Sequence, residues 1–222
     1  MSSNRTAAVI TGSLFLIAMI ASLLGGGLLE AVLNSQDYLA DIPTNSSPLW
    51  TGVYLELLNG IAVAGIAIVL FPILKRQNES IAIGYVGFRV LESVFCVIAA
   101  VIPLFLLSLS QDYVNGGGTE GANYQVLGSL LMTIRTQLAG LLIPVFFSLG
   151  ALLLYSSMYI SRIVPRFISV WGLIGVVLVL MLNLLELAPG FAIVLALPII
   201  LNEIFLGGWL IVKGFNPSAA TR

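Results

Sequence analysis

The feature that most constrains the fold is a series of six apolar segments, each long enough to cross a lipid bilayer, which takes about 20 residues as a helix. Only 9% of the 222 residues are charged, far below the roughly 25% of a soluble domain. The sequence therefore predicts an all-α, polytopic membrane protein, a six-transmembrane-helix bundle that forms a single domain over residues 1–222. The expected helices cover approximately residues 7–29, 49–74, 81–109, 126–155 (bending at Pro144), 167–187 and 191–212.

Basic residues outside these segments indicate how the helices are oriented. They all precede the first segment, follow the last, or lie in the two connections on that same side of the membrane. They are Arg5, Lys75, Arg76, Arg162, Arg166, Lys213 and Arg222. The loops on the opposite side contain no Lys or Arg. By the positive-inside rule, both the N- and C-termini are predicted to be cytoplasmic.

The composition also excludes several classes of function. The chain has no histidine, which excludes histidine-ligated haem, histidine-based zinc hydrolases and histidine general bases. Its one cysteine, Cys96, rules out an intrachain disulfide. Because the sequence has no basic domain and no run of like charge, we expect no nucleic-acid partner. We expect no cofactor either.

The third segment carries two charges, Arg89 and Glu92, which lie three residues apart and so share one helix face. A charge at the centre of a bilayer costs roughly 2.5–3.5 kcal/mol on insertion scales, so both need partners. Glu203 in the sixth segment reaches a similar depth. We therefore predict that Arg89 lies between Glu92 and Glu203, and that Tyr85 and Asn202 complete a candidate ligand-binding site.

A second polar group is predicted nearer the outer surface. Glu56 and Asn59 share a face of the second segment, and Arg135 in the fourth lies at a similar depth, so Glu56 and Arg135 are expected to pair. The two groups together hold three carboxylates against two guanidiniums. Either one carboxyl is protonated, or a cation or a water-filled cavity balances the extra charge.

Three functional interpretations remain open. In the first, a non-enzymatic protein binds, and in one version transports, a small anionic or amphiphilic ligand at the Arg89 cluster. In the second, a structural or accessory subunit uses its buried pairs only to fix helix packing, alone or as a homo-oligomer. The third and least favoured is an intramembrane enzyme, which needs two carboxyls such as Glu92 and Glu203 facing one cavity. Membrane lipids are the expected partners in each.

Several motifs spread over most of the chain resemble a bacterial family of six-helix integral membrane proteins, the domain of unknown function DUF4386. They are Glu56, Gly84-Tyr85…Arg89…Glu92, Arg135, Val164-Pro165-Arg166, Trp171-Gly172-Leu173, Pro198…Glu203…Trp209 and Lys213-Gly214-Phe215. The resemblance implies a location in the bacterial cytoplasmic membrane. It brings no established activity, substrate or cofactor.

Overall fold

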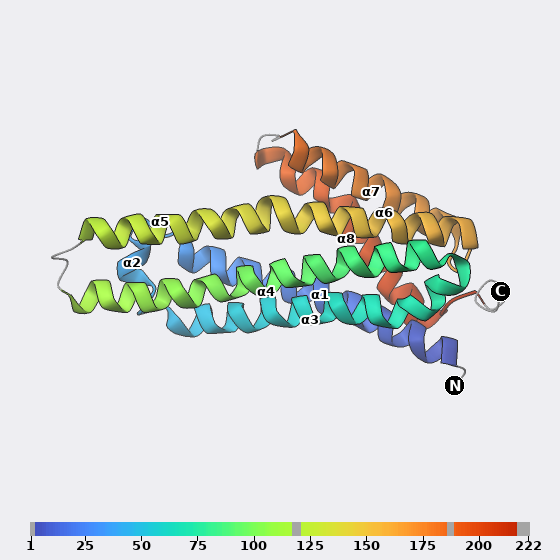
Figure 1. Ribbon diagram of the computed structural model, residues 1–222, viewed down its shortest axis with the longest axis horizontal. Helices are drawn as coiled ribbons and strands as arrows, with labels where there is room; N and C mark the ends of the chain where they lie inside the picture. Colours follow the sequence, from blue (N-terminus) through green and yellow to red (C-terminus); the bar gives the residue numbers. More distant parts are fainter. Residues whose placement is uncertain (1–2, 117–120, 186–188, 217–222) are drawn as a thin grey trace.

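The computed structural model describes residues 3–116, 121–185 and 189–216, and within these ranges the chain forms helices and no strand. Figure 1 shows their arrangement. The helices are α1 (Ser3–Leu33), α2 (Tyr38–Asp41), α3 (Ser46–Gln77), α4 (Glu79–Asn115), α5 (Gly121–Gln137), the π-helical turn η1 (Leu138–Leu142), α6 (Ile143–Ser161), α7 (Arg166–Leu184) and α8 (Pro189–Val212). The expected end of the fifth helix at residue 187 and the basic residue Arg222 lie outside the described ranges.

Six helical segments of the described chain are long and apolar enough to cross a membrane, which confirms the predicted number. The fourth of them joins α5, η1 and α6 end to end. Several helices extend beyond the predicted bounds. The 37 residues of α4, for example, span about 55 Å, whereas a bilayer's hydrocarbon core measures about 30 Å. These helices therefore continue past the apolar runs that reveal them in the sequence.

The π turn lies immediately before Pro144, the residue at which a bend is expected. Proline has no N–H to donate to the carbonyl of Gly140, and its ring crowds that carbonyl. The chain accommodates this by widening one turn, in which the Ile143 N–H donates to the carbonyl of Leu138, five residues back. The proline thus produces a local π turn between α5 and α6.

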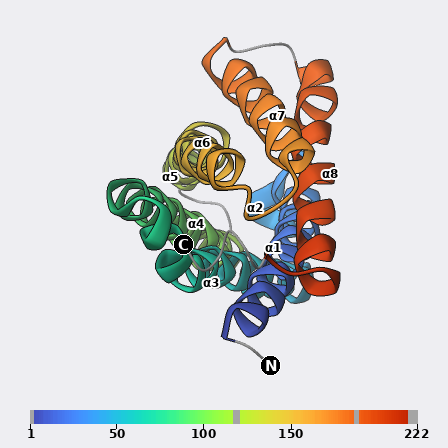
Figure 2. The ribbon, with the colours of Figure 1, turned by 90° about the vertical axis from the view of Figure 1, so that its right-hand side faces the viewer.

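At the end of the molecule that carries both described chain ends, six helices form a closed ring. The neighbours around it are α1–α3, α3–α4, α4–α6, α6–α7, α7–α8 and α8–α1 (Figure 2). Toward the opposite end, α7 and α8 tilt away from the long helices, and α5 takes the place of α6 beside α4 (Figure 1). The α7–α8 hairpin therefore completes the ring over only part of the length of the bundle.

Contact between α1 and α8 closes the ring. A Cβ added to Gly12 on α1 would lie 2.5 Å from the carbonyl oxygen of Gly207 on α8, so the two backbones approach closely. Arg5 on α1 donates to the last carbonyls of α8, the shortest bond being 2.6 Å from Nη2 to Ile211 O. A cation there satisfies carbonyls that no helical N–H can reach.

Candidate functional site

The predicted Arg89–Glu92 pair forms on α4, with 2.8 Å between Arg89 Nη1 and Glu92 Oε2. Both residues are only 4% exposed. Helix α6 makes room for the arginine, because a Cβ at Gly150 would lie 3.1 Å from Arg89 Cδ. The ring of Phe147, also on α6, has its centroid 5.7 Å from Arg89 Cζ. The guanidinium is thus held by an ion pair on one helix and an aromatic face on the next.

Hydrogen-bonding capacity around this pair is not fully used. Arg89 Nε is buried and has no partner within the described part of the chain. The same is true of the hydroxyls of Tyr85 and Tyr155, both fully buried and both within electrostatic range of Arg89. Buried polar groups are nearly always paired, so unmet groups gathered in one place indicate a site for water or a ligand.

A pocket of about 230 Å³ lies beside the pair, in the middle of the ring. Its charged lining consists of Arg89, Glu92 and Glu203. Its remaining wall is largely apolar and comes from several helices. These residues include Phe15 and Met19 of α1, Ile66 of α3, Phe147 of α6 and Val179 of α7. The pocket therefore places a small charged patch against an apolar surface.

Glu203 lies on the pocket wall, but the predicted direct pair between Glu203 and Arg89 does not form. No ion pair to Glu203 is present within the described residues, and the direct partner of Arg89 is Glu92 alone. The side chain of Glu203 is half-buried and within electrostatic range of Arg89. The pocket thus holds one unpaired carboxylate. Acidic side chains and cysteine come together nowhere in the described chain in a group that could hold a metal ion.

The other two residues predicted for this site, Asn202 and Tyr85, are not among the residues that line the pocket. Asn202 is fully buried, and its Nδ2 donates to Ile168 O of α7 over 2.9 Å. It therefore joins α8 to α7 and fixes the rotation of α8, which sets the direction of the neighbouring Glu203. Tyr85 is also fully buried, and neither residue lines the pocket. Their role in ligand binding stays a prediction.

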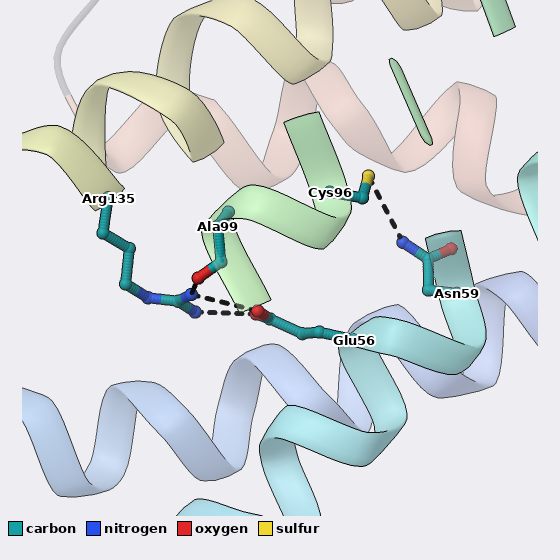
Figure 3. Close-up of polar contacts among 5 residues, drawn as sticks. All are labelled: Glu56, Asn59, Cys96, Ala99 and Arg135. Atoms are coloured by element: carbon teal, nitrogen blue, oxygen red, sulfur yellow. Dashed lines mark hydrogen bonds and ion pairs between the residues drawn. The ribbon is translucent and has the colours of Figure 1, made fainter. Parts of the chain in front are cut away.

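The predicted outer pair, Glu56 with Arg135, is present (Figure 3). Arg135 Nη2 lies 2.7 Å from Glu56 Oε1, and Arg135 Nη1 lies 3.0 Å from Glu56 Oε2 and 2.6 Å from Ala99 O. Both terminal nitrogens and both carboxylate oxygens are thus engaged, the geometry of a strong bidentate pair. The arrangement ties α5 to α3 and α4. Asn59, one turn from Glu56, reaches Cys96 Sγ at 3.9 Å.

Two further pockets connect this pair with the inner pocket. One, of about 270 Å³, shares Ser22, Asn59 and Ile143 with the inner pocket. The other, of about 400 Å³, shares Glu30 and Arg135 with that second pocket and extends to Asn34 at the end of α1. The three form one groove between α1 and the α5–η1–α6 span. Its floor is α3 and α4, and α7 and α8 contribute to the lining only at the inner pocket.

Glu30 is the groove residue that sequence reasoning missed. It is exposed and lines both outer pockets. The apolar run of the first segment ends at Leu29, so Glu30 reads as the beginning of a loop, whereas α1 continues to Leu33. The spacing of residues on α1 could have identified Glu30, because small or polar residues recur every four positions along one face of this helix. These are Ser22, Gly26, Glu30 and Asn34.

Six helices of the described chain that are long and apolar enough to cross a membrane indicate a multi-pass helical membrane protein. The chain belongs to the family described as Domain of unknown function (DUF4386), whose model matches residues 10–214. This confirms the resemblance seen in the sequence motifs. Neither the curated proteins nor the solved structures contain a match to the chain.

Proposed function

We propose that this protein binds a small amphiphilic molecule without transforming it, and that Arg89 binds an anionic group of that molecule in the inner pocket. The observation that carries the proposal is a guanidinium only 4% exposed that lines a pocket and keeps an unpartnered Nε donor. A buried arginine with spare donors is suited to a carboxylate or phosphate.

The shape of the groove supports an amphiphile over a purely polar ligand. The inner pocket has an apolar wall opposite its charges, which suits a hydrocarbon chain. Beyond Ser22 the groove lies between α1 and the α5–η1–α6 span, where the α7–α8 hairpin tilts away (Figure 1). A bound molecule placed in the inner pocket keeps its polar group at Arg89 while its apolar part packs on the apolar wall.

The Glu56–Arg135 pair supports a second and different role. Because Ala99 and Glu56 together occupy both terminal nitrogens of Arg135, this arginine has little capacity left for a ligand. It stands where the two outer pockets meet. We therefore assign this pair to holding α3, α4 and α5 together, which is the accessory role considered for the whole chain. In this position it also limits the width of the groove.

We also propose a location in the bacterial cytoplasmic membrane, with both termini in the cytoplasm. Support comes from the distribution of the basic residues that lie outside the membrane. Those within the described chain lie at the start of α1, the end of α3, the connection from α6 to α7 and the end of α8. Figure 1 shows these parts at the end of the bundle that carries both chain ends, and the positive-inside rule expects basic residues on the cytoplasmic side. These residues are Arg5, Lys75, Arg76, Arg162, Arg166 and Lys213.

The test compares purified wild-type protein with two variants, Arg89→Gln and the double variant Arg89→Gln/Glu92→Gln. Losing Arg89 alone leaves Glu92 as an uncompensated buried charge, so the single variant is expected to lose about 3–5 kcal/mol of stability. The double variant removes both charges and is expected to fold. Native mass spectrometry in mild detergent then shows which small molecules and lipids each protein retains.

The proposal predicts that the folded double variant loses a species that the wild-type protein retains. A double variant that folds and carries the same bound species as the wild type would show that the pair only stabilises helix packing. Lys75→Gln/Glu79→Gln is the matched control, because it neutralises an exposed ion pair that lines none of the three pockets, and it should retain the bound species.

A further inference from the structure

The charges of the inner pocket do not balance. Arg89 contributes one positive charge, and Glu92 and Glu203 contribute two negative ones. Asn59 and Ser22, the polar residues that complete the lining, are neutral. With every group ionised, the pocket carries an excess of one negative charge, and a purely anionic ligand would increase that excess inside the membrane. Such an excess is costly where the dielectric constant is low.

If every group is ionised, the excess charge lies on Glu203. Glu92 has its counter-charge on the same helix at 2.8 Å, whereas Glu203 is without an ion pair in the described chain. The side chain is half-buried at the pocket wall. The bond from Asn202 Nδ2 to Ile168 O fixes the segment of α8 that carries it. The pocket thus presents an oriented carboxylate with no partner of its own, on a different helix from Arg89.

We infer that the ligand is zwitterionic, with an anionic group on Arg89 and a positively charged amine on Glu203. The inference rests on the proposed function and specifies the class of molecule bound. An amine at Glu203 supplies the missing counter-charge, and it forms a charge-assisted hydrogen bond in a region that water reaches poorly. The two ends of the polar group are then held by α4 and α8, across the pocket.

The walls and size of the pocket suit such a group. Its volume of about 230 Å³ exceeds the roughly 30 Å³ that one water molecule takes up several-fold, so a small headgroup fits. The aromatic rings of Phe15 and Phe147 line the same space. Aromatic faces favour ammonium groups over anions. An acyl chain attached to the headgroup would pack on Met19 and Ile143, which are apolar residues of the pocket wall.

Two sources can supply this chemistry, a membrane lipid with an amine-containing headgroup or a free soluble zwitterion. The experiment separates them by using three probes. Phosphatidylethanolamine and phosphatidylglycerol with identical acyl chains differ in the amine. Glycerophosphoethanolamine has the same amine and phosphate but no acyl chains. Purified full-length protein is delipidated in mild detergent and titrated with each probe, and native mass spectrometry measures the bound fraction.

For the wild-type protein we expect phosphatidylethanolamine to bind about tenfold more tightly than phosphatidylglycerol, the effect of one charge-assisted contact. Glu203→Gln should remove this preference and leave phosphatidylglycerol binding as strong or stronger. The substitution removes an unpaired charge, so the fold should survive it. Glu79→Gln is the matched control, because Glu79 is exposed at the end of α4, paired with Lys75, and should keep the preference.

If glycerophosphoethanolamine displaces the lipid, the ligand is a soluble zwitterion. If it does not, the ligand is a lipid. Both outcomes support an amine bound at Glu203. Equal wild-type affinity for the two lipids, or a preference that survives Glu203→Gln, overturns the inference. The proposed function then still stands if Arg89→Gln/Glu92→Gln abolishes binding of both lipids. If the wild type binds none of the probes, both proposals fail.

Discussion

Two buried arginines in one membrane protein can have different roles. The hydrogen-bond donors that each guanidinium leaves without a partner distinguish these roles. Arg135 gives both terminal nitrogens to Glu56 and Ala99, so it fastens three helices. Arg89 gives one nitrogen to Glu92, keeps a buried Nε without a partner in the described chain, and lines a pocket. In the sequence, the pair of Arg89 lies within one helix and the pair of Arg135 lies between two helices. The sequence does not show which hydrogen-bond donors of each arginine stay unpartnered.

The outer pair should show strong energetic coupling. Glu56→Gln alone and Arg135→Met alone each leave a partner charge uncompensated at a largely buried site, and each should lower the free energy of unfolding by about 3 kcal/mol. The double variant should lose clearly less than the two single losses combined. Unfolding the four proteins with denaturant in mixed micelles measures this. Additive losses would mean that the pair does not hold the helices together.

At the residue scale, the sequence predicts an ion pair correctly when the depth of two charges in the membrane is enough to bring them together. Glu56 and Arg135 lie at matching depths and face each other, as expected. Matching depth did not predict the position of the Glu203 side chain, because side chains at adjacent positions on a helix point about 100° apart. On α8 that rotation turns Asn202 toward α7 and leaves Glu203 at the pocket without a direct bond to Arg89. Single-sequence hydropathy carries no information about this rotation.

At the scale of elements, the apolar runs predicted the spanning helices because hydropathy is a local property. It predicted their ends less well, since helices such as α4 continue through polar residues. The four-residue helix α2 was not predicted at all. It is held by tertiary contacts, among them the burial of Leu39 and the hydrogen bond from Ser110 Oγ to Leu39 O, which no local pattern reveals.

Close packing of α1 on α8 should make two glycines of the same helix respond differently to substitution. Gly12→Ala puts a methyl group against the Gly207 carbonyl and should cost about 1–3 kcal/mol of stability. Gly27→Ala meets nothing within 4 Å and should be neutral or stabilise by up to about 1 kcal/mol through helix propensity. Thermal unfolding of both variants in detergent measures the difference. An equal response at the two positions would contradict the observed packing.

At the scale of the whole molecule, the helices form a closed ring at one end of the bundle. Toward the opposite end, a groove runs along one side of the bundle. The ring of contacts from α1 round to α8 encloses the inner pocket, whereas the groove between α1 and α5 continues beyond the hairpin of α7 and α8 (Figures 1 and 2). The inner pocket thus adjoins a groove that continues beyond the ring.

The proposed orientation has a direct test in single-cysteine labelling. In a Cys96→Ala background, Ser47→Cys at the start of α3 should react with a membrane-impermeant thiol reagent on intact cells. Ser80→Cys at the start of α4 should react only after the membrane is permeabilised. Both positions are exposed, while Cys96 is 5% exposed and should give little background. The reverse pattern would place the basic end of the bundle outside the cell.

The bond between Arg5 and the last carbonyls of α8 joins positions more than 200 residues apart in the chain. A ribosome releases the first helix long before the last, so α1 must wait in the membrane, packed on α3, until α8 arrives. The contact between α1 and α8 can therefore form only after α8 has been synthesised. A nascent chain that stops before α8 lacks both the carbonyls that Arg5 binds and the carboxylate of Glu203, so assembly and the completion of the pocket coincide.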